Sequence, residues 1–190
     1  MDLPYIEDKI FVKKDFSQIR LAIGEYESCS FLYCDFSNSD LSEAIFSECS
    51  FENCNLSMTS LIKTAFRENR FKNCKMPGLH FENCNKLGLS FILDTCKLEN
   101  SSFYQLKLRN SDFKNSNFNE SDFTECDLSN SVFENCNFIR ATFENTVIEK
   151  CDFHTSFNYS IDPEKNRIRK AKFSLSGIAG LLEKYDISIL

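Results

Sequence analysis

The chain has 190 residues, of which 42% are hydrophobic and 14% aromatic, so it can build one domain with a sizeable core. It contains no apolar run near the ~20 residues that a membrane-spanning helix needs, and charged residues interrupt the N-terminal segment where a signal peptide would lie. These features predict a cytoplasmic protein with no membrane contact. The net charge of −6 disfavours direct binding to nucleic acid.

A five-residue repeat runs through most of the chain. Large apolar residues recur at every fifth position from Phe11 to Phe91 and, after a shift of two residues, from Leu98 to Phe153. Of these 29 positions only Lys86 is not large and apolar, and 18 of the 20 phenylalanines occupy them. A period of five fits neither a helix nor a flat strand. We therefore expect a chain that turns a corner at each repeat and stacks its coils by parallel-strand pairing.

The position two residues before each large residue is also expected to face inward. It holds all ten cysteines, and its other occupants are mostly Ser, Thr and Ala. Cysteines 20 apart, such as Cys29 and Cys49, would stack within disulfide range. However, the same position accepts several small residues, which indicates a requirement for smallness rather than for sulfur. No CxxC or CxxH spacing occurs, so we expect reduced core thiols and neither a metal nor another cofactor.

The repeat unit resembles that of the pentapeptide repeat family, in which a small residue is followed by Asp or Asn, by Leu or Phe, and by two polar residues. Residues 34–38 (CDFSN), 121–125 (SDFTE) and 126–130 (CDLSN) carry the resemblance. It implies an all-β fold, a right-handed quadrilateral parallel β-helix with four repeats per coil. We assign residues 11–155 to this β-helix and expect residues 1–10 to cap its N-terminal end.

The shift in register predicts an irregular segment at residues 92–97. One interpretation is a small bulge that the solenoid tolerates. The other is a loop that contacts a partner, because binding residues are often found on loops of rigid scaffolds. The candidate loop residues are Ile92, Leu93, Asp94 and Thr95.

Residues 156–190 depart from the repeat. A turn near residues 161–166 precedes apolar residues at helical spacing, which predicts a short C-terminal α-helix that begins at Ser174 or Ser176 and ends near Lys184. This helix and the tail after it either cap the last coil or form a homodimer interface. The candidate dimerisation residues are Leu175, Ile178, Leu181, Leu182, Tyr185, Ile187 and Ile189.

The C-terminal region resembles that of the microcin-immunity and the Qnr and MfpA quinolone-resistance types of pentapeptide protein. The resemblance implies a cytoplasmic homodimer that protects DNA gyrase and mimics DNA by its rod shape and acidic surface. The charge pattern is partly consistent with mimicry. No Lys or Arg occurs between Leu21 and Ser60, a basic band follows from Lys63 to Lys86, and a second acidic band lies between Lys114 and Arg140.

The acidic bands supply the candidate partner-binding residues. A solvated surface that keeps the rod soluble would show the same pattern, so that interpretation stays open. The candidates are Glu25, Glu43, Glu48, Glu52, Glu120, Asp122, Glu125, Asp127 and Glu134.

Nothing in the sequence indicates catalysis, since it has no nucleophile with a histidine partner, no Gly-rich phosphate loop and no metal-binding motif. Two non-enzymatic hypotheses follow. In the first, the rod binds a type II topoisomerase, DNA gyrase or topoisomerase IV, and protects it from a quinolone or peptide toxin or modulates it. In the second, the rod is a structural or protein-interaction solenoid with an unrelated partner.

Overall fold

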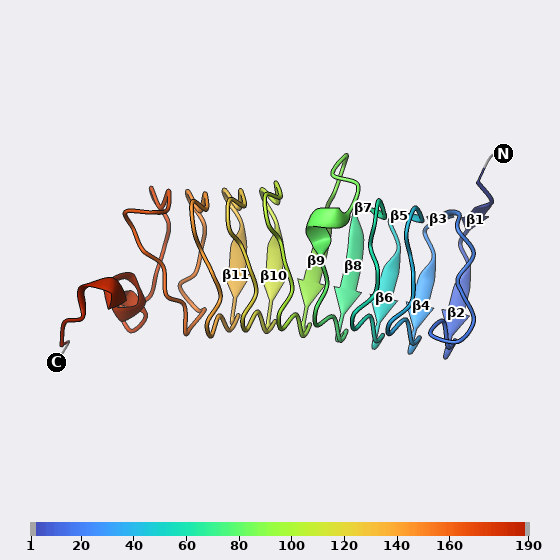
Figure 1. Ribbon diagram of the computed structural model, residues 1–190, viewed down its shortest axis with the longest axis horizontal. Helices are drawn as coiled ribbons and strands as arrows, with labels where there is room; N and C mark the ends of the chain where they lie inside the picture. Colours follow the sequence, from blue (N-terminus) through green and yellow to red (C-terminus); the bar gives the residue numbers. More distant parts are fainter. Residues whose placement is uncertain (1–2, 189–190) are drawn as a thin grey trace.

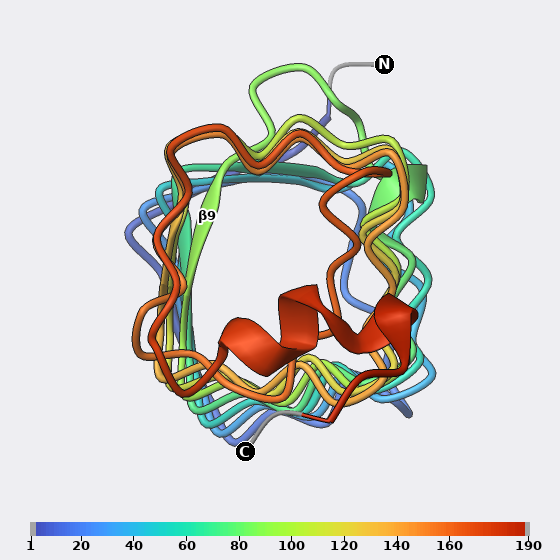
Figure 2. The ribbon, with the colours of Figure 1, turned by 90° about the vertical axis from the view of Figure 1, so that its left-hand side faces the viewer.

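The computed structural model describes residues 3–188 of the chain. These residues wind into a right-handed parallel solenoid that is long in one direction and four-sided in cross-section (Figures 1 and 2). A regular coil takes 20 residues, since Tyr5 pairs with Glu25 and Glu25 pairs with Ile45. The predicted quadrilateral β-helix is therefore confirmed.

Two sides of the rod carry parallel sheets. The first sheet has the order β1-β3-β5-β7, and the second has the order β11-β10-β9-β8-β6-β4-β2. Single parallel bridges, such as Asp35 with Asn55 and Asp40 with Ser60, join the coils on the other two sides. The strands are β1 (Tyr5–Glu7), β2 (Ile10–Val12), β3 (Glu25–Glu27), β4 (Ser30–Leu32), β5 (Ile45–Ser47), β6 (Ser50–Glu52), β7 (Ala65–Arg67), β8 (Asn69–Lys72), β9 (Phe91–Asp94), β10 (Asp112–Lys114) and β11 (Val132–Glu134), and a 3-10 helix, η1 (Phe81–Asn83), lies between β8 and β9.

Columns of stacked phenylalanine rings fill the rod. The ring centroid of Phe31 lies 4.7 Å from that of Phe11 and 4.7 Å from that of Phe51, with nearly parallel planes. Rings from adjacent sides meet edge to face, as Phe31 and Phe36 do at 5.6 Å and 67°. Both arrangements suit the ring quadrupole and add ~0.5–1.5 kcal/mol per pair to the hydrophobic effect. The five-residue spacing of large apolar residues thus encodes the core.

The small inward residue of each repeat bridges two coils through hydrogen bonds. The Ser156 hydroxyl donates to the carbonyl oxygen of Phe133 at 2.8 Å and accepts the backbone N–H of Cys136 at 3.1 Å. The Cys74 thiol donates in the same way to the carbonyl oxygen of Phe51 at 3.3 Å. The position therefore favours a small side chain that can donate a hydrogen bond, a requirement beyond the smallness that the sequence indicated. All ten cysteines are free and buried, as expected for core thiols.

The interruption of the repeat lies earlier than the sequence predicted. Ile92–Thr95 do not form a loop, because Phe91–Asp94 are strand β9 and Leu93 pairs with Phe71 in the second sheet. The chain instead leaves the solenoid at Lys86–Leu89, which project from its side (Figures 1 and 2).

Burial explains this correction. Lys86 occupies an inward slot in the sequence count, and a charged side chain without a partner is too costly to bury there. The chain bulges outward at this point, and Lys86 is exposed. Phe91 turns inward two positions before Leu93 and fills the space, with its ring centroid 5.2 Å from that of Phe81.

Both ends of the solenoid extend beyond the predicted boundaries. At the N-terminal end, β1 and β2 form the first coil in register with β3 and β4, and Ile10 is 64% exposed. The described part of residues 1–10 therefore begins the solenoid rather than folding over its end. At the other end the coils continue past residue 155, because Asp152 bridges to Lys172 and the ring of Phe173 stacks on that of Phe153 at 5.6 Å.

The C-terminal segment forms two short 3-10 helices, η2 (Ile178–Leu181) and η3 (Glu183–Tyr185), in place of the predicted α-helix. Neither Ser174 nor Ser176 caps a helix, because the N-cap of η2 is Gly177; the Ser174 hydroxyl accepts the N–H of Gly177 at 3.0 Å in the turn before η2. The segment lies tightly on the last coil, because a Cβ atom at Gly180 would come within 2.0 Å of the Tyr159 carbonyl oxygen. It crosses the end of the rod (Figure 2). No helix among residues 3–188 meets the length and hydropathy of a membrane span.

Candidate protein-interaction surface

The nine candidate acidic residues do not form one patch. Glu25 lies on β3 in the first sheet, whereas Glu52 on β6 and Glu134 on β11 lie in the second sheet. Glu48 follows β5 at the corner between the two sheets. The others lie in other coils or at other corners and are Glu43, Glu120, Asp122, Glu125 and Asp127.

Several of these carboxylates are neutralised by a base in a neighbouring coil. Glu43 pairs with Lys63 at 3.4 Å between the charged atoms, and Asp127 pairs with Arg109 at 2.6 Å. Two further candidates are paired in the same way, Glu120 with Arg140 and Glu134 with Lys114. The sequence reasoning missed these basic partners. In the sequence these partners could have been found as bases that lie about one coil, 18–20 residues, from an acid.

Five of the candidates form no ion pair among residues 3–188, namely Glu25, Glu48, Glu52, Asp122 and Glu125. The first three lie in the coils between Leu21 and Ser60 that contain no base. In the same coils, Glu27 accepts a hydrogen bond from the Tyr5 hydroxyl at 2.8 Å. That bond and the negative charge of Glu27 raise the pKa of Tyr5 to about 12. We call Glu25, Glu27, Glu48 and Glu52 the N-terminal acidic surface. It spans β3, β6 and the corner between β5 and β6.

The C-terminal segment presents apolar side chains to solvent. Leu175 is 88% exposed, and Ile178, Tyr185 and Ile187 are also exposed, while Leu181 and Leu182 are half-buried against the last coil. Ile189 lies outside the described residues.

Charged contacts hold this segment in place. The Lys184 ammonium lies 2.6 Å from an Asp162 carboxylate oxygen and 2.7 Å from one of Glu164. Desolvation alone lowers the pKa of Lys184, but the hydrogen bonds to both carboxylates outweigh it and raise the pKa above its usual range. The exposed apolar residues are therefore presented by an anchored segment.

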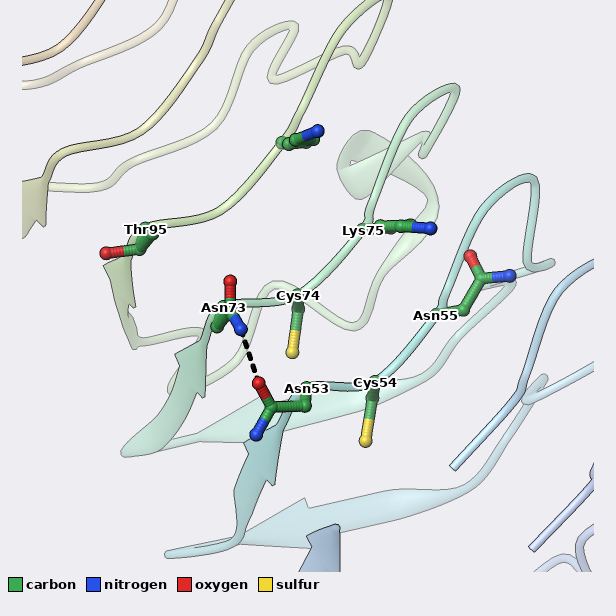
Figure 3. A pocket seen from close by; sticks show the side chains of 8 residues that line it. Asn53, Cys54, Asn55, Asn73, Cys74, Lys75 and Thr95 are labelled. Carbon is green, nitrogen blue, oxygen red and sulfur yellow. Dashed lines mark hydrogen bonds between the residues drawn. The ribbon is translucent and has the colours of Figure 1, made fainter. Parts of the chain in front are cut away.

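A hollow of about 280 Å³ lies over one corner of the rod, lined by polar side chains and two thiols (Figure 3). Asn73 donates to Asn53 along this corner, while the side chains of Cys54 and Cys74 reach down to the carbonyl oxygens of the preceding coil. The hollow therefore presents amide and lysine groups rather than a nucleophile.

Burial makes most of the thiols unreactive. It raises the pKa of Cys49 and of Cys84 to about 12, so neither is a thiolate near neutral pH. No group of three or more His, Cys, Asp or Glu side chains among residues 3–188 is arranged to hold a metal ion. Within the described part of the chain, the surface offers charged and apolar contacts for a partner.

Comparisons with known proteins agree with this architecture. The structure resembles a trypsin-treated form of QnrB1, described as a plasmid-mediated fluoroquinolone resistance protein, with a TM-score of 0.77 and 17% identity over 98% of this chain and 92% of that chain. It also resembles HetL, a pentapeptide repeat protein involved in heterocyst differentiation regulation in the cyanobacterium Nostoc sp. strain PCC 7120, with a TM-score of 0.51 and 12% identity over 92% of this chain and 86% of that chain. No curated protein matches the sequence. The model of the pentapeptide repeat region matches residues 25–95 and 90–158, so the chain belongs to the pentapeptide repeat family.

Proposed function

We propose that the protein is a non-enzymatic binding protein whose target is a type II topoisomerase, DNA gyrase or topoisomerase IV. Binding would protect the enzyme from a quinolone or a peptide toxin, or modulate it. The observation that carries the proposal is the N-terminal acidic surface, because its carboxylates lie in coils without a single Lys or Arg between Leu21 and Ser60. A surface that binds duplex DNA is basic, so a rigid acidic rod can compete for it.

Two further features support this function. The fold is the one found in QnrB1, whose description includes fluoroquinolone resistance. The exposed apolar residues of the C-terminal segment, led by Leu175 and Ile187, suit a homodimer interface. We propose that two copies associate there, in the cytoplasm, and so form a longer rod with an acidic surface at each end.

A supercoiling assay tests the proposal. Gyrase from the source organism is titrated with the protein, with and without ciprofloxacin. We expect either rescue of supercoiling in the presence of the drug or inhibition in its absence. The triple variant E25Q/E48Q/E52Q should lose the effect, while E43Q/E120Q/E134Q should retain it. Both variants lose three negative charges, but the second loses only carboxylates that are already paired.

One observation favours the second function, a protein-interaction solenoid with an unrelated partner. Acids and bases cancel in pairs along the C-terminal half of the rod, as Glu149 does with Arg167 and Asp152 with Lys172. A duplex carries one charge per ~1.7 Å, and this half of the rod offers no such density. If about 10 μM protein leaves supercoiling unchanged, a concentration at which a micromolar complex is mostly formed, this second function is favoured.

A further inference from the structure

The coil that carries the projecting loop lacks one corner of the rod. In regular coils the corner before the second sheet is made by a residue with positive φ, such as Glu48, Glu68 or Asn110. In the interrupted coil the corresponding residue, Ser90, does not have positive φ, and the left-handed residue is Gly88, inside the loop. The chain therefore runs straight into β9, and the corner is recessed.

The recess is a hollow of about 420 Å³ between two intact corners. Its floor consists of Leu89–Ile92, and its walls are Glu68–Arg70 on one side and Leu108–Asp112 on the other. The walls belong to coils on either side of the interrupted one, because Phe71 and Phe113 both pair with Leu93. Two coil spacings separate them by ~9.6 Å, which admits one side chain or one extended segment.

The floor is apolar and the rim is basic. Leu89 and Ile92 are half-buried, and Leu87 on the overhanging loop is 76% exposed. Arg70 lines the recess, Arg67 and Lys107 directly precede residues of its two walls, and Lys86 begins the projecting loop beside it. None of these four bases forms an ion pair among residues 3–188.

Some bases at the recess are already paired. Arg109, in one wall, pairs with Asp127, and Lys114 pairs with Glu134. The carboxylates that line the recess are those of Glu68 and Asp112, and Asp112 already faces Lys114 at 3.4 Å. The rim therefore keeps a net positive charge.

We propose that this recess is a docking site for an acidic segment of a protein partner, with an apolar side chain anchored on Leu89 and Ile92. Carboxylates of the segment would face Arg70 in the wall and Lys86 of the projecting loop. The proposal stands apart from the topoisomerase function, because it uses the opposite charge and a different set of coils.

Charge and shape favour such a segment over a nucleic acid. The N-terminal acidic surface lies within about two coils of the recess on the same sides of the rod, and it repels a duplex that is long enough to span both. A duplex is also too wide for a gap of ~9.6 Å, and phosphates gain nothing from an apolar floor. A peptide with one apolar anchor and flanking carboxylates satisfies the floor and the rim together.

A displayed library of random twelve-residue peptides tests the proposal. The full-length protein is the bait, and R70E/K86E is the comparison. We expect enriched peptides to combine Asp or Glu with a Leu, Ile, Phe or Met anchor, and R70E/K86E to weaken their binding by about tenfold or more. The matched control K13E/K150E reverses two exposed lysines that also lack an ion pair and should bind like the unaltered protein.

A second variant removes the recess instead of its charge. Deleting Lys86 and Gly88 restores the 20-residue spacing between Phe71 and Leu93 and places Leu87 in the inward slot, two positions after Cys84. This variant should keep the circular dichroism of the solenoid and lose the selected peptides.

Three results would overturn the proposal. In the first, the selection enriches no acidic peptide whose binding depends on Arg70 and Lys86. Another is a 20-base-pair duplex that binds more tightly than the peptides and loses affinity in R70E/K86E. The third is sedimentation that shows R70E/K86E dissociating a dimer, which would assign the recess to a second copy of the chain.

Discussion

Replacing Ser156 by Ala tests the hydrogen-bonding bridge between coils with a minimal change. Ser156 is 3% exposed, and the substitution removes one oxygen atom and no apolar contact. The carbonyl oxygen of Phe133 loses a donor at 2.8 Å, and the N–H of Cys136 loses its acceptor at 3.1 Å. That N–H has no other partner among residues 3–188.

The expected loss is large for such a small change. An orphaned buried donor costs about 1–3 kcal/mol and a lost neutral hydrogen bond about 0.5–1.5 kcal/mol, so Ser156→Ala should lower the free energy of unfolding by about 2–4 kcal/mol. Urea denaturation followed by circular dichroism measures this value. Ser156→Thr keeps the hydroxyl and should lose less. Ser47→Ala, on the outer face of β5, should stay within about 0.5 kcal/mol of the unaltered protein. If Ser156→Ala unfolds at the same urea concentration as Ser47→Ala, the bridge contributes nothing and the reasoning is refuted.

Three other predictions concern the corners, the charges and the thiols. Gly78 has φ +67°, so G78A should destabilise the fold by the ~1–2 kcal/mol of a left-handed Ala. A Cβ atom there would lie 2.2 Å from the Met58 sulfur, but Met58 is 61% exposed and its flexible end can move aside, so urea denaturation should give the same cost in an M58A background. Desolvation alone raises the pKa of Asp152, but hydrogen bonds from Lys172 and His154 lower it to about 2. Its contribution is therefore fully present above about pH 4 and disappears as the pH falls towards 2, and D152N should flatten the acid limb of a stability-against-pH curve over that window. A thiol-specific reagent should label none of the ten cysteines rapidly in the native protein and all ten in guanidinium without reductant; fewer than ten would indicate disulfides.

The sequence predicted the core well because the repeat reports burial directly. The five-residue spacing alone identifies an inward-facing residue such as Phe31 or Phe123, whatever residues lie beside it. The same count placed the irregular loop at Ile92–Thr95, whereas it lies at Lys86–Leu89. A count of positions treats Phe91 and Leu93 alike as large apolar residues, and only three-dimensional packing shows which of them stacks on Phe71.

The candidate surface was less predictable, since ion pairs form between residues one coil apart. Glu43 and Lys63 belong to separate charge bands in the sequence, yet they are neighbours on the rod. The C-terminal segment illustrates a further limit. Its apolar spacing suits an α-helix, but the segment forms two short 3-10 helices, with Gly180 packed closely against Tyr159. Such a contact depends on the last coil, which no local pattern describes.

Competition between this protein and DNA for gyrase tests the central claim most directly. Labelled protein is bound to gyrase, and linear duplex DNA is added in increasing amounts. The account predicts that DNA displaces the protein completely, and that E25Q/E48Q/E52Q binds at least about tenfold more weakly than E43Q/E120Q/E134Q. Stable binding that DNA does not affect, or equal affinities for the two variants, would contradict the role of the N-terminal acidic surface.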